Sequence, residues 1–134
     1  MASIWNADSG ELLHVLQGHT EPILWAEFTA AGDRIVTGGM DGTARLWDVT
    51  SGEQLGAPME HEGLVTCVTF DPAGERIVTT TDSERKGRLS RAWIWDTSDR
   101  SKVELEGHES RIVHAAFSPD GERVATASFD MTVR

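Results

Sequence analysis

The chain has 134 residues, of which 39% are hydrophobic and 25% charged, and its formal net charge at pH 7 is −10. This length and composition are typical of one folded domain and exclude an intrinsically disordered chain. The acidic charge argues against nucleic acid and against an anionic membrane surface as partners, because both repel a negative field.

The single cysteine and the absence of long apolar runs bear on the compartment. Cys67 has no second cysteine with which to form a disulfide, which suits a reducing environment. No apolar run approaches the roughly 18 to 20 residues of a membrane span, and the start MASIWNADSG lacks the regions of a signal peptide. We therefore expect a cytoplasmic protein with no membrane partner.

Short strand patterns follow one another from the N-terminus. After IWNADSG come the weak strand pattern GELLHVLQ (10–17), then ILWAEF (23–28), RIVTGG (34–39), TARLWDV (43–49) and the weaker GEQLGAP (52–58). The segment TAAGD between ILWAEF and RIVTGG has the composition of a hairpin turn. This stretch predicts a run of short antiparallel strands.

The same succession then occurs twice more. The second unit has LVTCVTF (64–70), RIVTTT (76–81), RAWIWDT (91–97) and SKVELE (101–106). The third unit has RIVHAAF (111–117), RVATAS (123–128) and the short segment MTVR (131–134). Four short strands per unit of about 42 residues, with no helical periodicity between them, indicate an all-β repeat architecture.

The repeat can be counted from its tryptophans and histidines. Trp5, Trp47 and Trp95 are 42 and 48 residues apart, and the longer interval contains the inserted segment SERKGRLS. A Thr follows a His by 18 residues in three pairs, His19 with Thr37, His61 with Thr79 and His108 with Thr126. Chance does not readily produce three such registers, so the chain is built of repeats.

These units resemble the blades of WD-repeat β-propellers. The pairs Gly18-His19 and Gly107-His108, with Glu60-His61 as a variant, are similar to the Gly-His element of that family, and Trp47-Asp48 and Trp95-Asp96 to its Trp-Asp element. The resemblance covers essentially the whole chain. It implies a β-propeller built of four-stranded antiparallel blades, with three blades in each chain.

The resemblance also implies a hydrogen-bonded tetrad in each blade, formed by a His, a Thr or Ser, an Asp and a Trp. In blade one the four residues are His19, Thr37, Asp41 and Trp47. Blade two has His61, Thr79 and Trp95, but Ser83 stands at the Asp position and Asp82 comes one residue early, which puts this tetrad in doubt. Blade three has His108, Thr126 and Asp130.

The Trp of blade three is not found at its expected place in the chain. The spacing of blade one puts it two positions after Arg134, whereas Ile4 and Trp5 align with the end of that strand. We expect Trp5 of one copy to complete blade three of the next, so that oligomerisation closes the ring and removes the exposed sheet edge. Two copies would give six blades and three copies nine, and we slightly favour three because a wider ring strains the packed blades less.

This scheme divides the chain as a single propeller segment. Residues 4–17 are expected to be the closing strands of the preceding blade, 18–59 blade one, 60–106 blade two with an insertion at 82–91, and 107–134 the start of blade three.

No sequence feature indicates an enzyme. His, Thr and Asp recur once per unit, whereas an active site is normally single, so a structural role is favoured over a nucleophilic triad. There is no His-x-x-His or Cys-x-x-Cys spacing, no calcium loop and no phosphate-binding glycine loop. His14 and His114 fall on strand patterns and are expected to be packed or lining residues. We therefore expect no catalytic residue, no metal and no cofactor.

A surface for other proteins is the remaining candidate. In the family, partners often bind the face that carries the loop before the first strand and the loop between the second and third strands. The positions that match its contact sites are Pro22, Leu24, Met40, Leu64, Thr66, Arg111, Val113 and Phe129. These side chains could equally pack against neighbouring loops. The inserted loop adds a basic cluster that could recruit an acidic segment or be a solvated hairpin tip: Arg85, Lys86, Arg88 and Arg91.

Two functional hypotheses stay open at this point. The first is a non-catalytic scaffold that binds other proteins and assembles with itself. The second is an engineered or excised propeller fragment with no binding role beyond assembly. The repeats diverge too much for a design by plain duplication, which indicates a natural parent.

Overall fold

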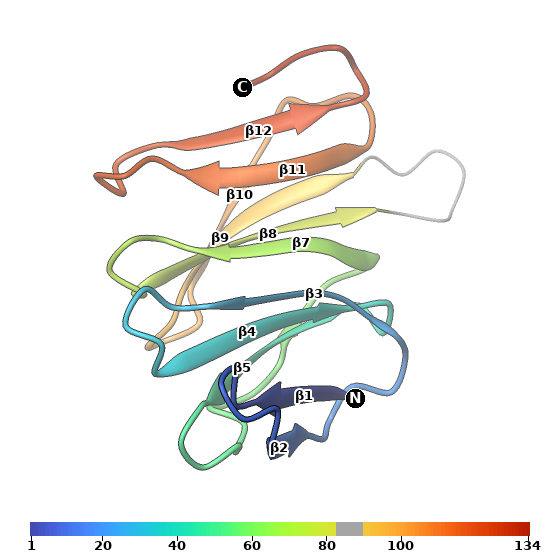
Figure 1. Cartoon of the computed structure of the whole chain (residues 1–134). Helices are drawn as coiled ribbons and strands as arrows, with labels where there is room; N and C mark the ends of the chain where they lie inside the picture. The colour runs from blue at the N-terminus through green and yellow to red at the C-terminus, as the bar shows by residue number, and fades with distance from the viewer. Residues whose placement is uncertain (83–89) are drawn as a thin grey trace.

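The computed structural model describes residues 1–82 and 90–134, which form twelve β-strands and contain no helix. The strands make four antiparallel sheets. Figure 1 shows these sheets stacked one on another, from β1 and β2 at one end to β11 and β12 at the other. The prediction of an all-β chain with four-stranded antiparallel sheets is confirmed.

The first sheet has two strands, β1 (Ala2–Trp5) and β2 (Leu12–Leu16), joined by a tight turn. The carboxamide oxygen of Asn6 accepts hydrogen bonds of 2.9 Å from the backbone N–H groups of Asp8 and Ser9, which fixes the turn in the manner of an Asx motif. β1 begins at Ala2, two residues before the expected boundary at Ile4.

The second sheet, blade one, has the order β3 (Ile23–Phe28), β4 (Arg34–Gly39), β5 (Thr43–Asp48) and β6 (Met59–Glu60). The prediction of an outer strand at residues 52–58 is wrong, because this segment makes one bridge, from Gln54 to Trp47, and β6 follows it. Gly56 has a positive φ of 72° and Pro58 has no N–H, so the segment cannot continue a strand ladder.

The third sheet, blade two, has the order β7 (Leu64–Phe70), β8 (Arg76–Asp82), β9 (Arg91–Asp96) and β10 (Lys102–Leu105). The predicted insertion at 82–91 lies between β8 and β9, and its residues 83–89 are outside the described part of the chain. All four strands were predicted from their sequence patterns.

The last sheet, the inner part of blade three, consists of β11 (Ile112–Phe117) and β12 (Val124–Ser128). After β12 the backbone groups of Thr126 and Arg134 exchange two hydrogen bonds of 2.9 Å. Blade one has the same pairing between Thr37 and Arg45, inside a longer ladder. The segment 131–134 therefore pairs as the beginning of a third strand.

The blades pack through their inner strands. β3 and β4 lie against β7, and β7 and β8 lie against β11. The largest apolar cluster joins Val36, Ala44, Leu46 and Met59 of blade one to Val65, Val68, Phe70, Ile77 and Trp95 of blade two. A second cluster joins Ile4 and Leu16 of the first sheet to Ile35 and Trp47 of blade one. Because side chains alternate along a strand, each blade presents one apolar face to the blade before it and one to the blade after it.

The chain does not close into a ring. The sheet of β1 and β2 and the sheet of β11 and β12 lie at opposite ends of the stack in Figure 1, so Trp5 does not meet blade three of its own chain. Completion of blade three by a second copy therefore stays a prediction. In the described residues there is also no helix of the length and apolarity that a membrane span requires.

Candidate functional site

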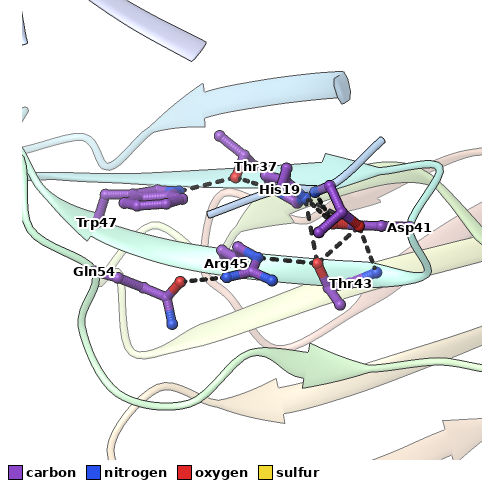
Figure 2. A network of polar contacts seen from close by, with 8 residues as sticks. His19, Thr37, Asp41, Thr43, Arg45, Trp47 and Gln54 are labelled. Carbon is purple, nitrogen blue, oxygen red and sulfur yellow. Dashed lines mark hydrogen bonds and ion pairs between the residues drawn. The ribbon is translucent and has the colours of Figure 1, made fainter. Parts of the chain in front are cut away.

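In blade one the four predicted tetrad residues lie in hydrogen-bond contact (Figure 2). The Nδ1 atom of His19 lies 2.9 Å from an oxygen of Asp41, and its Nε2 atom lies 2.8 Å from Thr37 Oγ1. The indole N–H of Trp47 donates to the same Oγ1 over 2.9 Å. Because an indole can only donate, Thr37 accepts from Trp47 and donates its own proton to Nε2 of His19. The proton of the imidazole is then on Nδ1, which donates to Asp41.

Burial and hydrogen bonding set the charges of this pair. Burial lowers the pKa of His19, although its hydrogen bond to Asp41 raises it. Burial alone would raise the pKa of Asp41, but hydrogen bonds from Thr43, from the backbone of Thr20 and from His19 lower it. At neutral pH the pair is therefore a neutral imidazole beside an ionised carboxylate, which agrees with the tautomer derived above.

The network extends beyond the four predicted residues. Thr43 donates its hydroxyl proton to Asp41 over 2.8 Å, and Arg45 donates to Thr43 over 3.1 Å and to Gln54 over 2.7 Å. Sequence reasoning missed this extension. The spacing of two residues between Asp41 and Thr43 was the available signal, because it recurs between Asp130 and Thr132 of blade three, which bond over 2.6 Å.

The Gly-His element also has a steric reason. A Cβ atom on Gly18 would lie 2.7 Å from the guanidinium of Arg45 and 3.0 Å from the ring of Trp47. Any larger residue would displace one of the two, so glycine lets the chain pass close to the tetrad before it reaches His19.

We expect Asp41→Ala to lower the free energy of unfolding by about 1–3 kcal/mol, because the buried Nδ1–H of His19 loses its acceptor. Asp41→Asn keeps an oxygen acceptor but no charge, so its effect should be smaller. Urea unfolding of both variants measures the difference. If Asp41→Ala unfolds at the urea concentration of the parent chain, the tetrad does not stabilise blade one.

In blade two the carboxylate is missing from the tetrad. His61 Nε2 lies 2.9 Å from Thr79 Oγ1, to which the indole of Trp95 donates over 3.0 Å. Nδ1 of His61 is buried and has no hydrogen-bond partner among the described residues. Asp82 instead accepts from Arg111 over 3.1 Å, and Ser83 lies outside the described residues. This tetrad is therefore described as three residues only.

The isolated position of His61 gives blade two a pH dependence. Burial lowers the pKa of His61 to about 4, and the carbonyls of Met59 and Gly42 offset this only in part. The unfolded chain binds the proton with a pKa of about 6.5. Between these two values the unfolded state carries the extra proton, so the folded state loses stability as the pH falls.

We expect the contribution of His61 to the free energy of unfolding to be constant above about pH 6.5. Between about pH 6.5 and pH 4 this contribution should fall by about 2–3 kcal/mol. Urea unfolding at intervals of half a pH unit measures the slope. His61→Gln should remove this part of the slope, whereas His14→Gln, which changes a histidine bonded to the carbonyl of Thr50 on the outer strand, should not. An unchanged slope in His61→Gln would show that His61 is not its source.

In blade three, three of the four tetrad residues meet. His108 lies 2.7 Å from Asp130 and 2.8 Å from Thr126. Trp5, expected to complete a blade of this type, is 58% exposed, whereas Trp47 and Trp95 are 1% and 5% exposed. Its indole has no hydrogen-bond partner among the described residues.

The candidate partner-binding positions gather at the ends of the inner strands. The backbone N–H of Met40 donates to the carbonyl of Pro22 over 2.8 Å, and that of Phe129 donates to the carbonyl of Arg111 over 2.9 Å. In blades one and three the two predicted loops therefore touch. We call this the loop face and define it by the residues Pro22, Leu24, Met40, Leu64, Thr66, Arg111, Val113 and Phe129.

The side chains of the loop face differ in exposure. Phe129 is 66% exposed, and Pro22, Leu24, Met40, Arg111 and Val113 are also exposed. Leu64 and Thr66 are half-buried. Leu24, Thr66 and Val113 lie where the ladder between the first two strands of each blade shifts register, and such a β-bulge turns a side chain out of its strand pattern.

The basic cluster is only partly within the described residues. Arg85, Lys86 and Arg88 lie outside them, and Arg91 pairs with Glu104 over 2.5 Å. Within residues 1–82 and 90–134 no three His, Cys, Asp or Glu side chains gather as they would around a metal ion. His114, expected as a lining residue, lies on β11 with its ring 6.2 Å from that of Trp25.

Comparison with known proteins agrees with the geometry. The family model described as "WD domain, G-beta repeat" matches residues 10–48, 52–85 and 99–134. The Notchless protein homolog of Arabidopsis thaliana is 45% identical over 42 residues, which are 31% of this chain and 9% of that protein. The anaphase-promoting complex subunit cdc20 of Dictyostelium discoideum is 50% identical over 42 residues, 31% of this chain and 8% of that protein. The matched segment thus spans less than a tenth of either relative.

Proposed function

Because this chain belongs to the WD-repeat family, we propose that it is a non-catalytic protein-interaction module that also assembles with copies of itself. Members of the family are generally not enzymes, and the hydrogen-bonded His, Thr and Asp residues recur from blade to blade as structural groups do. For its compartment we keep the proposal of the cytoplasm, which the single buried Cys67 suits.

The observation that carries self-assembly is the match between Trp5 and blade three. The hydroxyls of Thr37 and Thr79 each bond a histidine and a tryptophan, whereas the hydroxyl of the buried Thr126 bonds His108 alone among the described residues. Trp5 is an exposed tryptophan at the end of a strand that aligns with the continuation of 131–134. We propose that Trp5 of one copy donates to Thr126 of another and that the two half-blades become one sheet.

The proposed assembly is a ring of equivalent, head-to-tail contacts. Two copies contribute six blades and three copies nine, and both numbers are compatible with propeller closure by rotation. We propose three copies, because a wider ring requires less distortion of the packing seen between blades one and two. An alternative role as a fragment that only assembles would give the same ring, with no use for the loop face.

The loop face is the proposed site for other proteins. Its exposed apolar side chains, Met40 and Phe129 above all, are of the kind that anchor protein interfaces. The Dictyostelium relative is named as a subunit of a complex. We propose that this chain likewise contributes one surface to a multiprotein assembly.

Light scattering coupled to gel filtration tests the proposal. The single chain has a mass of 14.7 kDa, and we expect three times this mass at micromolar concentration, independent of further dilution over about tenfold. Twice this mass would support self-assembly but replace the trimer by a dimer. A chain that elutes at 14.7 kDa at every concentration would refute self-assembly.

A further inference from the structure

Equivalent phenylalanines in the three blades differ widely in exposure. Phe28, Phe70 and Phe117 each end the inner strand of a blade, and they pair with Ile35, Ile77 and Val124 of the next strand. Phe70 is 7% exposed because blade one covers it, whereas Phe28 is 52% exposed. The inner part of blade one is therefore bare on the side that faces away from blade two.

Blade three is also uncovered, on its side that faces away from blade two. Val36 of β4 and Val78 of β8 are completely buried, whereas Ala125, which occupies the same position in β12, is exposed. Val36 belongs to the cluster that covers Phe70. Blade one thus has an uncovered face equivalent to the face of blade two that packs on blade one. Blade three has an uncovered face equivalent to the face of blade one that packs on blade two.

An arginine joins neighbouring blades at the edge of these faces. Arg76, the first residue of β8, donates to the carbonyl of Gly121 over 2.6 Å and holds its guanidinium 5.3 Å from the ring centre of Phe117. Arg34, the first residue of β4, reaches the corresponding Gly74, where an added Cβ atom would lie 2.9 Å from its guanidinium. In both cases an arginine reaches the hairpin turn of the next blade.

Arg123 and Gly32, the corresponding arginine of blade three and glycine of blade one, make no such contact among the described residues. Arg123 precedes β12 as Arg34 and Arg76 begin β4 and β8, its side chain is exposed, and no described residue pairs with it. Gly32 corresponds to Gly74 and Gly121, and a Cβ atom added to it would meet nothing within 4 Å. We call Ile23, Ala26, Phe28 and Gly32 the Phe28 surface.

We propose that the Phe28 surface of one copy is the docking site for Arg123 of a second copy, with the guanidinium over the ring of Phe28 and donating to the carbonyl of Gly32. This inference rests on the proposed self-assembly and adds a second interface to the completion of blade three. A guanidinium over an aromatic face is favourable, and more so when both are removed from water.

Continuity with the packing inside the chain identifies the occupant. β1 and β2 already cover the outer part of the same side of blade one, where Ile4 and Leu16 pack on Ile35 and Trp47. If β1 of one copy completes blade three of a second copy, β11 and β12 of the second copy must lie beside β1. They then face β3 of the first copy, as β7 and β8 lie against β11 within the chain.

Sedimentation equilibrium over a range of concentrations tests the contact. We expect Phe28→Ala and Arg123→Ala each to raise the concentration of half-dissociation by about tenfold. Because each substitution already removes the contact between the two side chains, the double variant should raise this concentration only a little further. Arg123→Lys keeps the charge but not the planar group, so it should fall between. Val103→Ala, which changes an exposed apolar residue of the outer strand β10, should match the parent.

The outcomes separate this contact from the strand completion. If Phe28→Ala and Arg123→Ala dissociate as the parent does while Trp5→Ala is monomeric, the contact is refuted and self-assembly stands. Two independent effects that multiply fully in the double variant would also refute it, because the two side chains would then not touch. A parent chain that never assembles refutes both proposals. Thermal unfolding of the diluted variants checks that each still folds, which we expect because both side chains are exposed in the single chain.

Discussion

Trp5→Ala should convert the assembled chain into a monomer. In blades one and two the equivalent tryptophans are almost completely buried, at 1% and 5% exposure, and both donate to a buried threonine. Removal of a buried tryptophan typically costs 3–5 kcal/mol, which corresponds to about 10² to 10⁴ in a dissociation constant. Since the loss occurs at every contact between copies, the ring should not survive at micromolar concentration.

Sedimentation velocity of the parent, Trp5→Ala and Trp5→Phe measures this effect. Trp5→Phe keeps most of the apolar area but cannot donate to Thr126, so it should weaken the ring without abolishing it. Val103→Ala serves as a control, because Val103 is an exposed apolar residue of the outer strand β10, which neither proposed contact uses. A Trp5→Ala chain with the mass and stability of the parent would contradict strand completion.

The strands were predictable because the same local pattern occurs in each repeat. The segments that end in Phe28, Phe70 and Phe117 all became inner strands, and each hairpin turn after them was recognised from its Gly, Asp and Pro residues. Repetition makes such a prediction stronger than any single strand pattern, because three registers must agree at once.

The outer strand of blade one was not predictable in the same way. Its residues are few and weakly apolar, and its position is decided by the pairing of Met59 with Ala44, a contact between distant parts of the chain. Gly56 and Pro58 interrupt the segment where the pattern placed the strand. For an edge strand of this kind, long-range pairing decides more than local preference.

The tetrads could be located by spacing, but the choice of partners could not. Asp82 stands one residue before the expected carboxylate, and the sequence does not reveal that it faces Arg111 of the next blade instead of His61. The extension from Asp41 to Thr43 and Arg45 likewise depends on which side chains share one face of β5. Such contacts follow from the packed geometry.

Thr37→Val should lower the free energy of unfolding by about 2–4 kcal/mol, because it leaves two buried polar groups without a partner. Valine has nearly the shape of threonine but no hydroxyl, so the change removes hydrogen bonds without opening a cavity. His19 Nε2 loses its donor and the indole of Trp47 loses its acceptor. Urea unfolding at neutral pH measures the difference.

Thr126→Val in blade three is the matched variant, and its effect should depend on concentration. In the single chain the hydroxyl of Thr126 bonds only His108 among the described residues, so the substitution should have about half the effect of Thr37→Val in dilute solution. Where the ring forms, the indole of Trp5 would lose its acceptor as well, so the two variants should become equally destabilised and Thr126→Val should also assemble less well. If Thr37→Val unfolds like the parent, the threonine does not link the histidine and the tryptophan energetically. If Thr126→Val keeps the smaller effect at every concentration, the threonine of blade three receives no indole from a second copy.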